Sequence, residues 1–191
     1  MNIEVISPSE QLRVVAVETS RKLGEHGVRH ALWSGGHASI LGRHRNSNDV
    51  DFLVHDKDIG RVPDIFPEHS QLQTHDRTIV TLPTNPEVEL MANMDIHTPV
   101  GIFPWRMTEL VESHITLSRL PGWEGVPMVS PMETALLKAT LQRGPEVGKH
   151  DKADAQVMLA ADADIKYGAR RLQETGSGGR VLPWLKAACL V

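Results

Sequence analysis

The chain has 191 residues, of which 40% are apolar and 23% are charged, and its net charge is −4 with histidine neutral. This length predicts one compact domain or one domain with a small appendage, and the composition excludes collagen, a coiled-coil rod and a wholly disordered chain. Its apolar runs are far shorter than the roughly 18 residues of a membrane span, its start lacks a secretory signal, and Cys189 is its single cysteine. We therefore expect a cytoplasmic protein without a membrane partner. The negative net charge gives no strong signal for nucleic-acid binding.

The first two thirds of the chain predict a mixture of helices and strands. Ser7, Pro8 and Glu10 form a capping pattern that predicts a helix ending near Gly24. The segments predicted after it are a strand over 28–33, a short helix over 37–41, a strand over 49–54, a polar loop with a short helix over 56–73, a hairpin of 78–82 with 87–91, an irregular stretch over 96–106, and short edge strands over 115–117 and 126–129.

The chain after residue 130 predicts helices alone. Ser130, Pro131 and Glu133 repeat the capping pattern and predict a helix to about residue 142. Its inward residues are expected to be Met132, Leu136, Leu137 and Leu141. The other predicted segments are helices over 149–161, 165–174 and 182–190, with 176–179 as a flexible glycine-rich joint. We therefore expect an α/β core over residues 1–129 and a helical segment over residues 130–191 that packs on it.

The stretch from Gly35 to Asp51 holds the residues that indicate chemistry. Gly35 and Gly36 end a strand and open a helix, where bare backbone can approach a ligand and free N–H groups can bind an anion. After twelve further residues, Asp49 and Asp51 alternate along a strand, so both side chains share one face about 6.5 Å apart. Such carboxylates repel each other unless a cation lies between them, and Mg²⁺ takes oxygen ligands and leaves room for phosphates. This pairing is the minimum apparatus for phosphoryl or nucleotidyl transfer.

The same pattern resembles the nucleotidyltransferase superfamily, which has the polymerase-β-like fold. Gly-Gly at 35–36, then twelve residues, then Asp-x-Asp with apolar neighbours at 49–52 match its signature. The residues at 35–38 and 44–51 are similar to those found in the branch of AbiEii-type toxin nucleotidyltransferases and their small uncharacterised relatives. Ser34 departs from this pattern, because the family usually has an apolar residue there. The resemblance implies an α/β fold with a small mixed sheet and flanking helices, Mg²⁺ or Mn²⁺ as cofactor, and an NTP such as ATP as substrate.

The superfamily also implies a third carboxylate on a neighbouring strand, which ligates a metal ion and can act on the acceptor hydroxyl. Glu89 and Asp95 both stand between apolar residues. Glu89 is favoured because it lies on the clearer of the predicted strands, whereas Asp95 is nearer to the loop at Pro99. Both candidates stay open at this point.

A second resemblance lies in the helical segment. Relatives in the same branch carry a Lys at the end of an apolar helix, an Arg about five residues later, and a Lys-Asp-x-x-Asp element, and here Lys138, Arg143, Asp151 and Asp154 match with His150 inserted. Lys138 would offset triphosphate charge. Asp151 and Asp154 share a helix face, where they would hold Lys138 or Arg143, or orient the base or acceptor. The alternative role is a structural ion-pair cluster that locks the helical half of the chain onto the sheet.

The sequence therefore predicts a metal-dependent nucleotidyltransferase that moves an NMP from an NTP to the hydroxyl of an unknown acceptor, which is an RNA end, a protein or a small molecule. The candidate catalytic residues are Asp49, Asp51, Glu89, Asp95 and Lys138, and the candidate metal ligands are Asp49, Asp51 and Glu89. The candidate nucleotide-binding residues are Gly35, Gly36, Arg45, Ser47, Lys138, Asp151 and Asp154. The alternative is a non-catalytic nucleotide-binding or antitoxin-like module that retains the fold.

Overall fold

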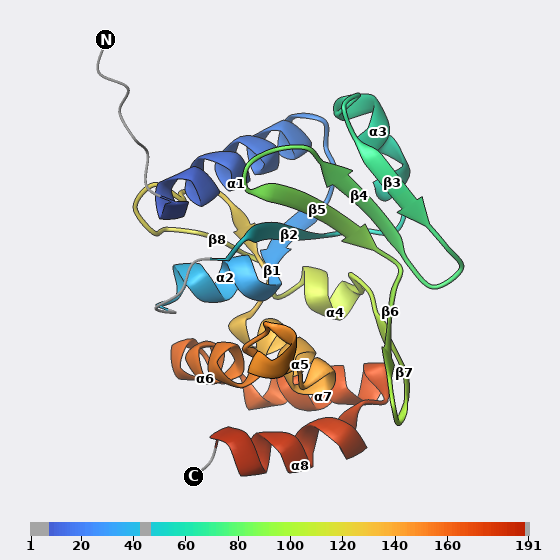
Figure 1. The fold of residues 1–191 in the computed structure, drawn as a ribbon, viewed down its shortest axis with the longest axis vertical. Helices are drawn as coiled ribbons and strands as arrows, with labels where there is room; N and C mark the ends of the chain where they lie inside the picture. The colour runs from blue at the N-terminus through green and yellow to red at the C-terminus, as the bar shows by residue number, and fades with distance from the viewer. Residues whose placement is uncertain (1–7, 43–46, 190–191) are drawn as a thin grey trace.

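A seven-stranded sheet forms the centre of the computed structural model, which describes residues 8–42 and 47–189 (Figure 1). The strand order is β3-β4-β5-β2-β1-β9-β8, and neighbours are antiparallel except β2 with β5 and β1 with β9. The strands are β1 (His30–Trp33), β2 (Asp49–Val54), β3 (Ser70–Gln73), β4 (Thr78–Leu82), β5 (Glu87–Ala92), β8 (Thr116–Leu117) and β9 (Pro127–Met128). The predicted hairpin of β4 and β5 is confirmed. The edge strand β3 is a correction, because all of its residues are exposed and their polar pattern gives no strand signal.

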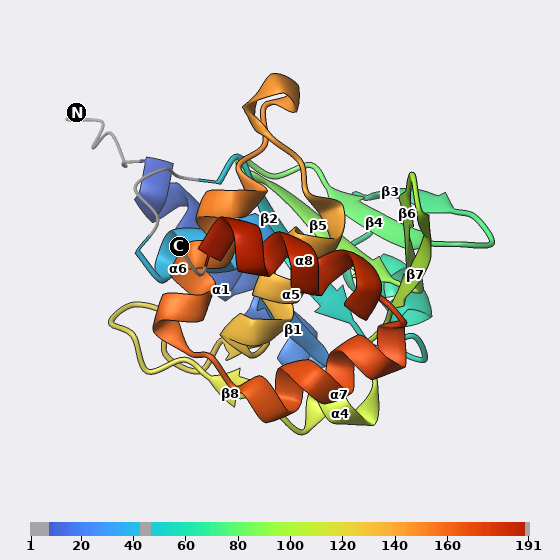
Figure 2. The same ribbon diagram turned by 90° about the horizontal axis from the view of Figure 1, so that it is seen from below.

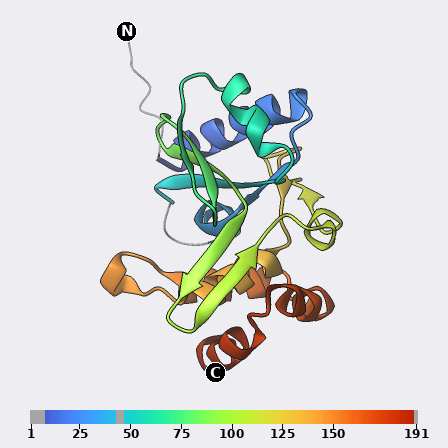
Figure 3. The same ribbon diagram turned by 90° about the vertical axis from the view of Figure 1, so that its right-hand side faces the viewer.

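A second, two-stranded sheet of β6 (Met94–Thr98) and β7 (Gly101–Trp105) continues from the end of β5 and extends beside the C-terminal helices (Figure 3). The prediction of irregular structure over 96–106 is therefore wrong. Pro99 lies in the turn, and Pro104 lies on a strand with a single neighbour, where a missing N–H is tolerated. Asn93, with a φ of 53°, redirects the chain between β5 and β6.

Helices cover both faces of the sheet (Figure 1). On one face lie α1 (Pro8–Glu25), η1 (Ile59–Arg61) and α3 (Val62–Ile65). The remaining helices are α2 (Ser34–Ile40), α4 (Glu109–Glu112), α5 (Pro131–Leu141), η2 (Pro145–Val147), α6 (Asp151–Ala161), α7 (Ile165–Thr175) and α8 (Gly178–Cys189). On the opposite face of the sheet, α5 contacts α2 and is surrounded by α6, α7 and α8 (Figure 2). In the part of the chain that the structure describes, no helix is long and apolar enough to cross a bilayer.

The central helix α5 is buried on almost every side. Nine of its eleven residues are buried, so the prediction of one inward face is too narrow. Ser130 caps its start by accepting a hydrogen bond from the Met132 N–H at 3.2 Å, as the sequence predicts. The capping box is not completed, because the Glu133 carboxylate instead accepts hydrogen bonds from Arg171 and Tyr167 on α7.

The glycine-rich joint predicted over 176–179 is also corrected. Gly176 ends α7 with a φ of 68°, but α8 begins directly at Gly178. Ser177 is fully buried between the two helices, and its hydroxyl lies 2.7 Å from the Thr175 hydroxyl. The burial of Ser177 and its contact with Thr175 make the connection a tight, packed turn. The proposed division of the chain at residue 130 stays a prediction.

The alternation of β2 decides which of its residues meet which helices. Phe52 packs into the apolar cluster with α1, whereas Leu53 packs into the cluster with α5. Because side chains alternate along a strand, Asp49 and Asp51 share the face of Leu53. The acidic pair therefore points toward the C-terminal helices, as the spacing predicts for two residues on one face.

Candidate functional site

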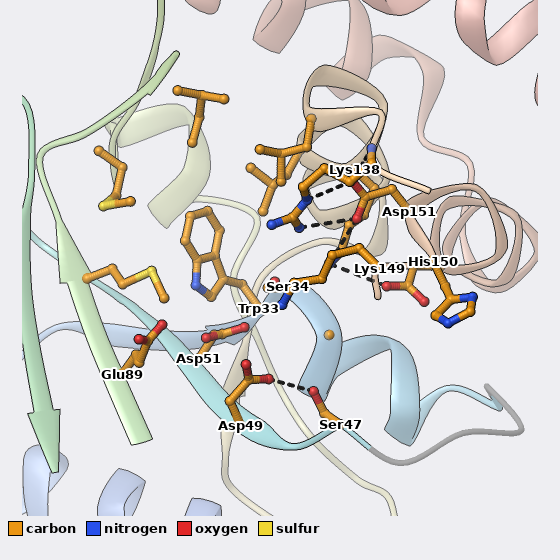
Figure 4. A pocket seen from close by; sticks show the side chains of 18 of the residues that line it. Trp33, Ser34, Ser47, Asp49, Asp51, Glu89, Lys138, Lys149, His150 and Asp151 are labelled. Atoms are coloured by element: carbon orange, nitrogen blue, oxygen red, sulfur yellow. Dashed lines mark hydrogen bonds and ion pairs between the residues drawn. The ribbon is translucent and has the colours of Figure 1, made fainter. Parts of the chain in front are cut away.

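The acidic face of β2 borders a cavity of about 400 Å³ between the sheet and the C-terminal helices (Figure 4). Candidate residues from distant parts of the chain line it, namely Gly35, Ser47, Asp49, Asp51, Glu89, Asp95, Lys138, Asp151 and Asp154. Gly36 does not line the cavity and is buried against β2, where an added Cβ would lie 3.7 Å from the Asp49 carbonyl oxygen. Arg45 lies outside the described residues. The fold therefore brings most of the candidates to one cavity.

Three carboxylates form the floor of this cavity. Asp51 lies directly opposite Glu89 in the parallel pairing of β2 with β5, and Asp49 precedes Asp51 on the same face (Figure 4). Burial, the charge of Asp49 and the charge of Glu89 raise the pKa of Asp51 to about 7, although Lys138 and a hydrogen bond from Ser34 oppose the shift. Burial and then the charge of Asp49 also raise the pKa of Glu89. Burial and mutual repulsion thus disfavour the ionised form of these acids, and Lys138 and Lys149 offset this only in part.

The two candidates for the third carboxylate are separated by their partners. Asp95 lines the same cavity, but its carboxylate accepts a hydrogen bond from Arg106 at 2.7 Å and forms an ion pair with it. Glu89 is half-buried beside Asp51 and forms no ion pair with any described residue. Of the two, Glu89 is the one that the parallel pairing places at the acidic floor.

The donor chemistry of the floor fits a divalent cation. Asp49, Asp51 and Glu89 offer hard oxygen ligands, and burial together with their mutual repulsion raises the pKa values of Asp51 and Glu89. Among residues 8–42 and 47–189, no three His, Cys, Asp or Glu side chains are already gathered as a metal cage. Mg²⁺ usually binds through one or two carboxylates, with waters and substrate phosphates as further ligands. An incomplete set of protein ligands is therefore sufficient for it.

A strained bend holds the start of α2 beside the acids. Ser34 has a φ of 62°, which a residue with a side chain adopts at some cost. The Ser34 N–H donates to the Thr134 Oγ1 at 3.3 Å, and that oxygen lies 3.1 Å from the His37 Nδ1. Burial lowers the pKa of His37 to about 4, so its imidazole is neutral at neutral pH. Thr134 on α5 therefore fixes the bend, and no sequence pattern pointed to this residue.

The basic residues of α5 and the following loop are engaged in an ion-pair cluster. The Lys138 Nζ lies 3.6 Å from the Asp151 Oδ1 and 3.3 Å from the Asp154 Oδ2, and all three side chains are buried. Arg143 donates to both carboxylate oxygens of Asp151, at 3.0 and 3.2 Å. The cluster joins α5 to α6 within the helical segment, so that Asp151 and Asp154 hold Lys138 and Asp151 also holds Arg143. Lys138 still acts on the acids, since its charge opposes the pKa shift of Asp51.

Smaller contacts complete the site. The Ser47 hydroxyl donates to the Asp49 Oδ1 at 2.8 Å, which places this candidate beside the acidic pair. Lys149 and His150 also line the cavity, and the charge of Lys149 partly offsets the rise in the pKa of Glu89. The inserted His150 directly precedes α6 and is one of the residues that line the cavity wall.

Comparison with known proteins was made by sequence and by structure. No family model matches the chain, and no curated protein matches its sequence. Similar solved structures include an antigenic nucleotidyltransferase-like protein from Paracoccidioides brasiliensis, with 16% identity, a TM-score of 0.50, and coverage of 95% of this chain and 94% of that one. A protein from Thermotoga maritima described as a putative nucleotidyltransferase has 18% identity and a TM-score of 0.54, with coverage of 76% of this chain and 92% of that one.

A third similar structure is ANT(2″)-Ia in complex with adenylyl-2″-tobramycin, with 12% identity, a TM-score of 0.57, and coverage of 87% of this chain and 97% of that one. The narrower resemblance to the AbiEii-type branch stays a prediction. These neighbours, together with the mixed sheet and its flanking helices, show that the chain has the nucleotidyltransferase fold.

Proposed function

We propose that this protein is a metal-dependent nucleotidyltransferase, which moves an NMP from an NTP to the hydroxyl of an acceptor. The observation that supports this function best is the placement of Asp49, Asp51 and Glu89 on one face of the sheet, in the same cavity as Gly35. Carboxylates with uncompensated charge favour binding of a divalent cation. The fold of the neighbouring solved structures supports the same class of reaction.

The chemistry follows from the positions of the acids. Asp49, Asp51 and Glu89 would hold Mg²⁺ or Mn²⁺, which when bound would neutralise the triphosphate and stabilise the entering and leaving oxygens. Glu89, on the strand beside the two aspartates, would also accept the proton of the acceptor hydroxyl. The hydroxyl oxygen then bonds to the α-phosphorus as the bond from that phosphorus to the bridging oxygen of the β-phosphate breaks. Pyrophosphate leaves, and the NMP remains on the acceptor.

The triphosphate would lie between the bend at Gly35 and the charged side of α5. Gly35 has no side chain, so phosphate oxygens could approach its backbone closely. Lys138 would offset phosphate charge, and its ion pairs hold it in position. The other nucleotide-binding residues that we propose are Arg45, Ser47, Asp151 and Asp154, whereas Gly36 contributes through its close packing against β2.

The acceptor is inferred from one neighbour. ANT(2″)-Ia was crystallised with an adenylylated small molecule, which favours ATP and a small-molecule acceptor here over an RNA end or a protein side chain. The acidic net charge of the chain agrees with this choice.

The test is transfer of label from each α-labelled NTP, with Mg²⁺ or Mn²⁺, to the components of a cell extract. The wild-type chain is expected to label an acceptor and release pyrophosphate, and the double variant Asp49→Asn, Asp51→Asn is expected to do neither while remaining folded. Asp162→Asn is the matched control, because Asp162 is exposed at the end of α6, outside the cavity. Transfer by the double variant at the wild-type rate would overturn the proposal.

A second experiment, combined with the transfer assay, tests the alternative of a non-catalytic module. Calorimetric titration with each NTP and Mg²⁺ measures binding independently of transfer. Binding that depends on Asp49 and Asp51, without pyrophosphate release under any acceptor condition, would identify a nucleotide-binding module that retains the fold.

A further inference from the structure

We propose that the part of the cavity beyond Glu89 binds the acceptor, and that this acceptor is a hydroxyl compound with an apolar body and an anionic group at its far end. We call this region the acceptor arm, and its lining residues are Arg77, Ile79, Met91, Met94, Asp95, Ile96 and His97, with Leu137 and Leu141 from α5 opposite. The inference rests on the proposed function and specifies the substrate of the same site.

The sheet register places the acceptor arm directly beside the acidic floor. Glu89 on β5 lies opposite Thr81 on β4, and Met91 lies opposite Ile79. Residues opposite each other share a face of the sheet, so Ile79 and Met91 continue the face of Glu89. Arg77 directly precedes β4, two residues before Ile79, and lines the same cavity. A straight path therefore leads from Glu89 over apolar side chains to Arg77.

The walls of the acceptor arm are mostly apolar. Six aliphatic or thioether side chains contribute to it, namely Ile79, Met91, Met94, Ile96, Leu137 and Leu141. Met94 and Ile96 come from β6, and this hairpin packs against α5. An extended apolar body therefore gains from transfer out of water along this path.

The charges of the acceptor arm favour an anion over a cation. Asp95, the carboxylate that lines the arm, is paired with Arg106 at 2.7 Å, and the His97 Nε2 lies at hydrogen-bond distance, 2.7 Å, from the Asp76 Oδ2. Arg77 is exposed and forms no ion pair with any residue that the structure describes. The arm thus offers one unpaired guanidinium and no unpaired carboxylate of its own, so a polycation would find repulsion at its mouth.

The strand geometry also sets the length of the acceptor. From Thr81, opposite Glu89, to Arg77, which directly precedes β4, is four residues along the chain, which corresponds to about 13 Å if the chain is extended throughout. The hydroxyl would lie at Glu89, where its proton is removed, and the anionic group would lie at Arg77. This separation matches an extended chain of about ten carbon–carbon bonds, rather than a compact sugar or amino acid.

The test uses ω-hydroxydodecanoate as the probe and its methyl ester as the uncharged match. Each is titrated calorimetrically into the full chain with Mg²⁺ and a non-hydrolysable α,β-methylene NTP. The acid is expected to bind about tenfold more tightly than the ester, as for one charge-assisted contact. Tobramycin, a polycation, is expected to bind more weakly than either.

Two variants locate the contact. Arg77→Ala is expected to abolish the difference between the acid and the ester, because the guanidinium that would bind the carboxylate of the acid is then absent. Arg119→Ala is the matched control, since Arg119 is exposed in the loop between β8 and β9 and does not line the cavity. Ile79→Asn is expected to weaken both probes equally, since it alters only the apolar wall.

The outcomes separate this inference from the proposed function. If the wild-type chain does not bind the NTP analogue with Mg²⁺, the proposed function fails. If the analogue binds but the acid binds no better than its ester, or tobramycin binds more tightly than both, the acceptor inference is overturned and the function stands. The same holds if Arg77→Ala and Arg119→Ala behave alike.

Discussion

Two groups of buried charges in this molecule differ in whether their charges are compensated. On the sheet, Asp51 lies beside Asp49 and Glu89, and burial together with these like charges raises its pKa to about 7. Among the C-terminal helices, Glu133 is fully buried but accepts hydrogen bonds from the Arg171 guanidinium at 2.9 and 3.0 Å and from Tyr167.

This difference separates a ligand site from a structural connection. The Glu133 carboxylate has all of its partners within the fold, so it stabilises the packing of α7 on α5. The acids on β2 and β5 accept hydrogen bonds from Ser47 and Ser34 but form no ion pair with any residue that the structure describes, so they favour a positively charged ligand. Mutation of the Glu133 region is therefore expected to lower stability, whereas mutation of the acids on the sheet is expected to change the pH dependence of stability and the activity.

The largest effect is expected at the compensated region. Arg171→Met leaves the Glu133 carboxylate buried beside Tyr167 without its cation, and this should lower the free energy of unfolding by about 3–5 kcal/mol. The measurement is urea denaturation. Arg170→Met is the control, because Arg170 is exposed on the same helix, and it should change stability by less than about 0.5 kcal/mol. Equal stability of the two variants would contradict a structural role for the pair.

The uncompensated region should instead respond to pH. Because the folded-state pKa of Asp51 is raised from 3.8 to about 7, its contribution to stability is present below pH 4 and is lost as pH rises through 7. His37, with its pKa lowered to about 4, gives the opposite slope at acidic pH, so the readout is the difference between wild type and Asp51→Asn. Without divalent cations, wild type should lose up to about 4 kcal/mol relative to the variant across this range.

Thermal unfolding at a series of pH values checks this prediction. Addition of Mg²⁺ at pH 8 should restore stability to wild type and not to Asp51→Asn. Parallel pH curves for the two proteins would show that Asp51 is not the titrating group.

A third experiment compares the two acids that the sequence left open. Glu89→Gln should reduce transfer about a hundredfold, as expected when a group that acts on the reacting atoms is lost. Asp95→Asn removes a carboxylate that is paired with Arg106, so its kcat should stay within a few-fold of wild type. Steady-state transfer kinetics provide the comparison, and a larger loss in Asp95→Asn than in Glu89→Gln would reverse the assignment.

The smallest effect is expected at the connection between the two regions. Thr134→Val removes the hydroxyl that fixes the Ser34 bend, and should raise KM for the NTP about tenfold with little change in kcat. Thr140→Val is the control, because the Thr140 hydroxyl is equally buried on α5 but donates only to the Leu136 carbonyl. Thr134→Ser should restore KM. Equal KM values for both valine variants would show that the bend is held by other contacts.

Most of the fold could be predicted from local pattern, and the errors have a common cause. The strands at 49–54, 78–82 and 87–91 carry strong alternation or apolar runs, and all are confirmed. The hairpin of β6 and β7 was missed because its prolines indicate irregular structure, whereas a strand with a single neighbour tolerates them. The exposed strand β3 was missed for a similar reason, since only its pairing with β4 makes it a strand.

The amino-acid sequence by itself determined that Asp49 and Asp51 share a face and that two glycines precede them, because strand periodicity and backbone freedom are local properties. Only the tertiary structure decided that Glu89 joins them, since its position depends on the register between β2 and β5. It also decided which charges are compensated, because the partners of a buried carboxylate come from segments distant in the chain, and long-range packing alone brings them within hydrogen-bond distance.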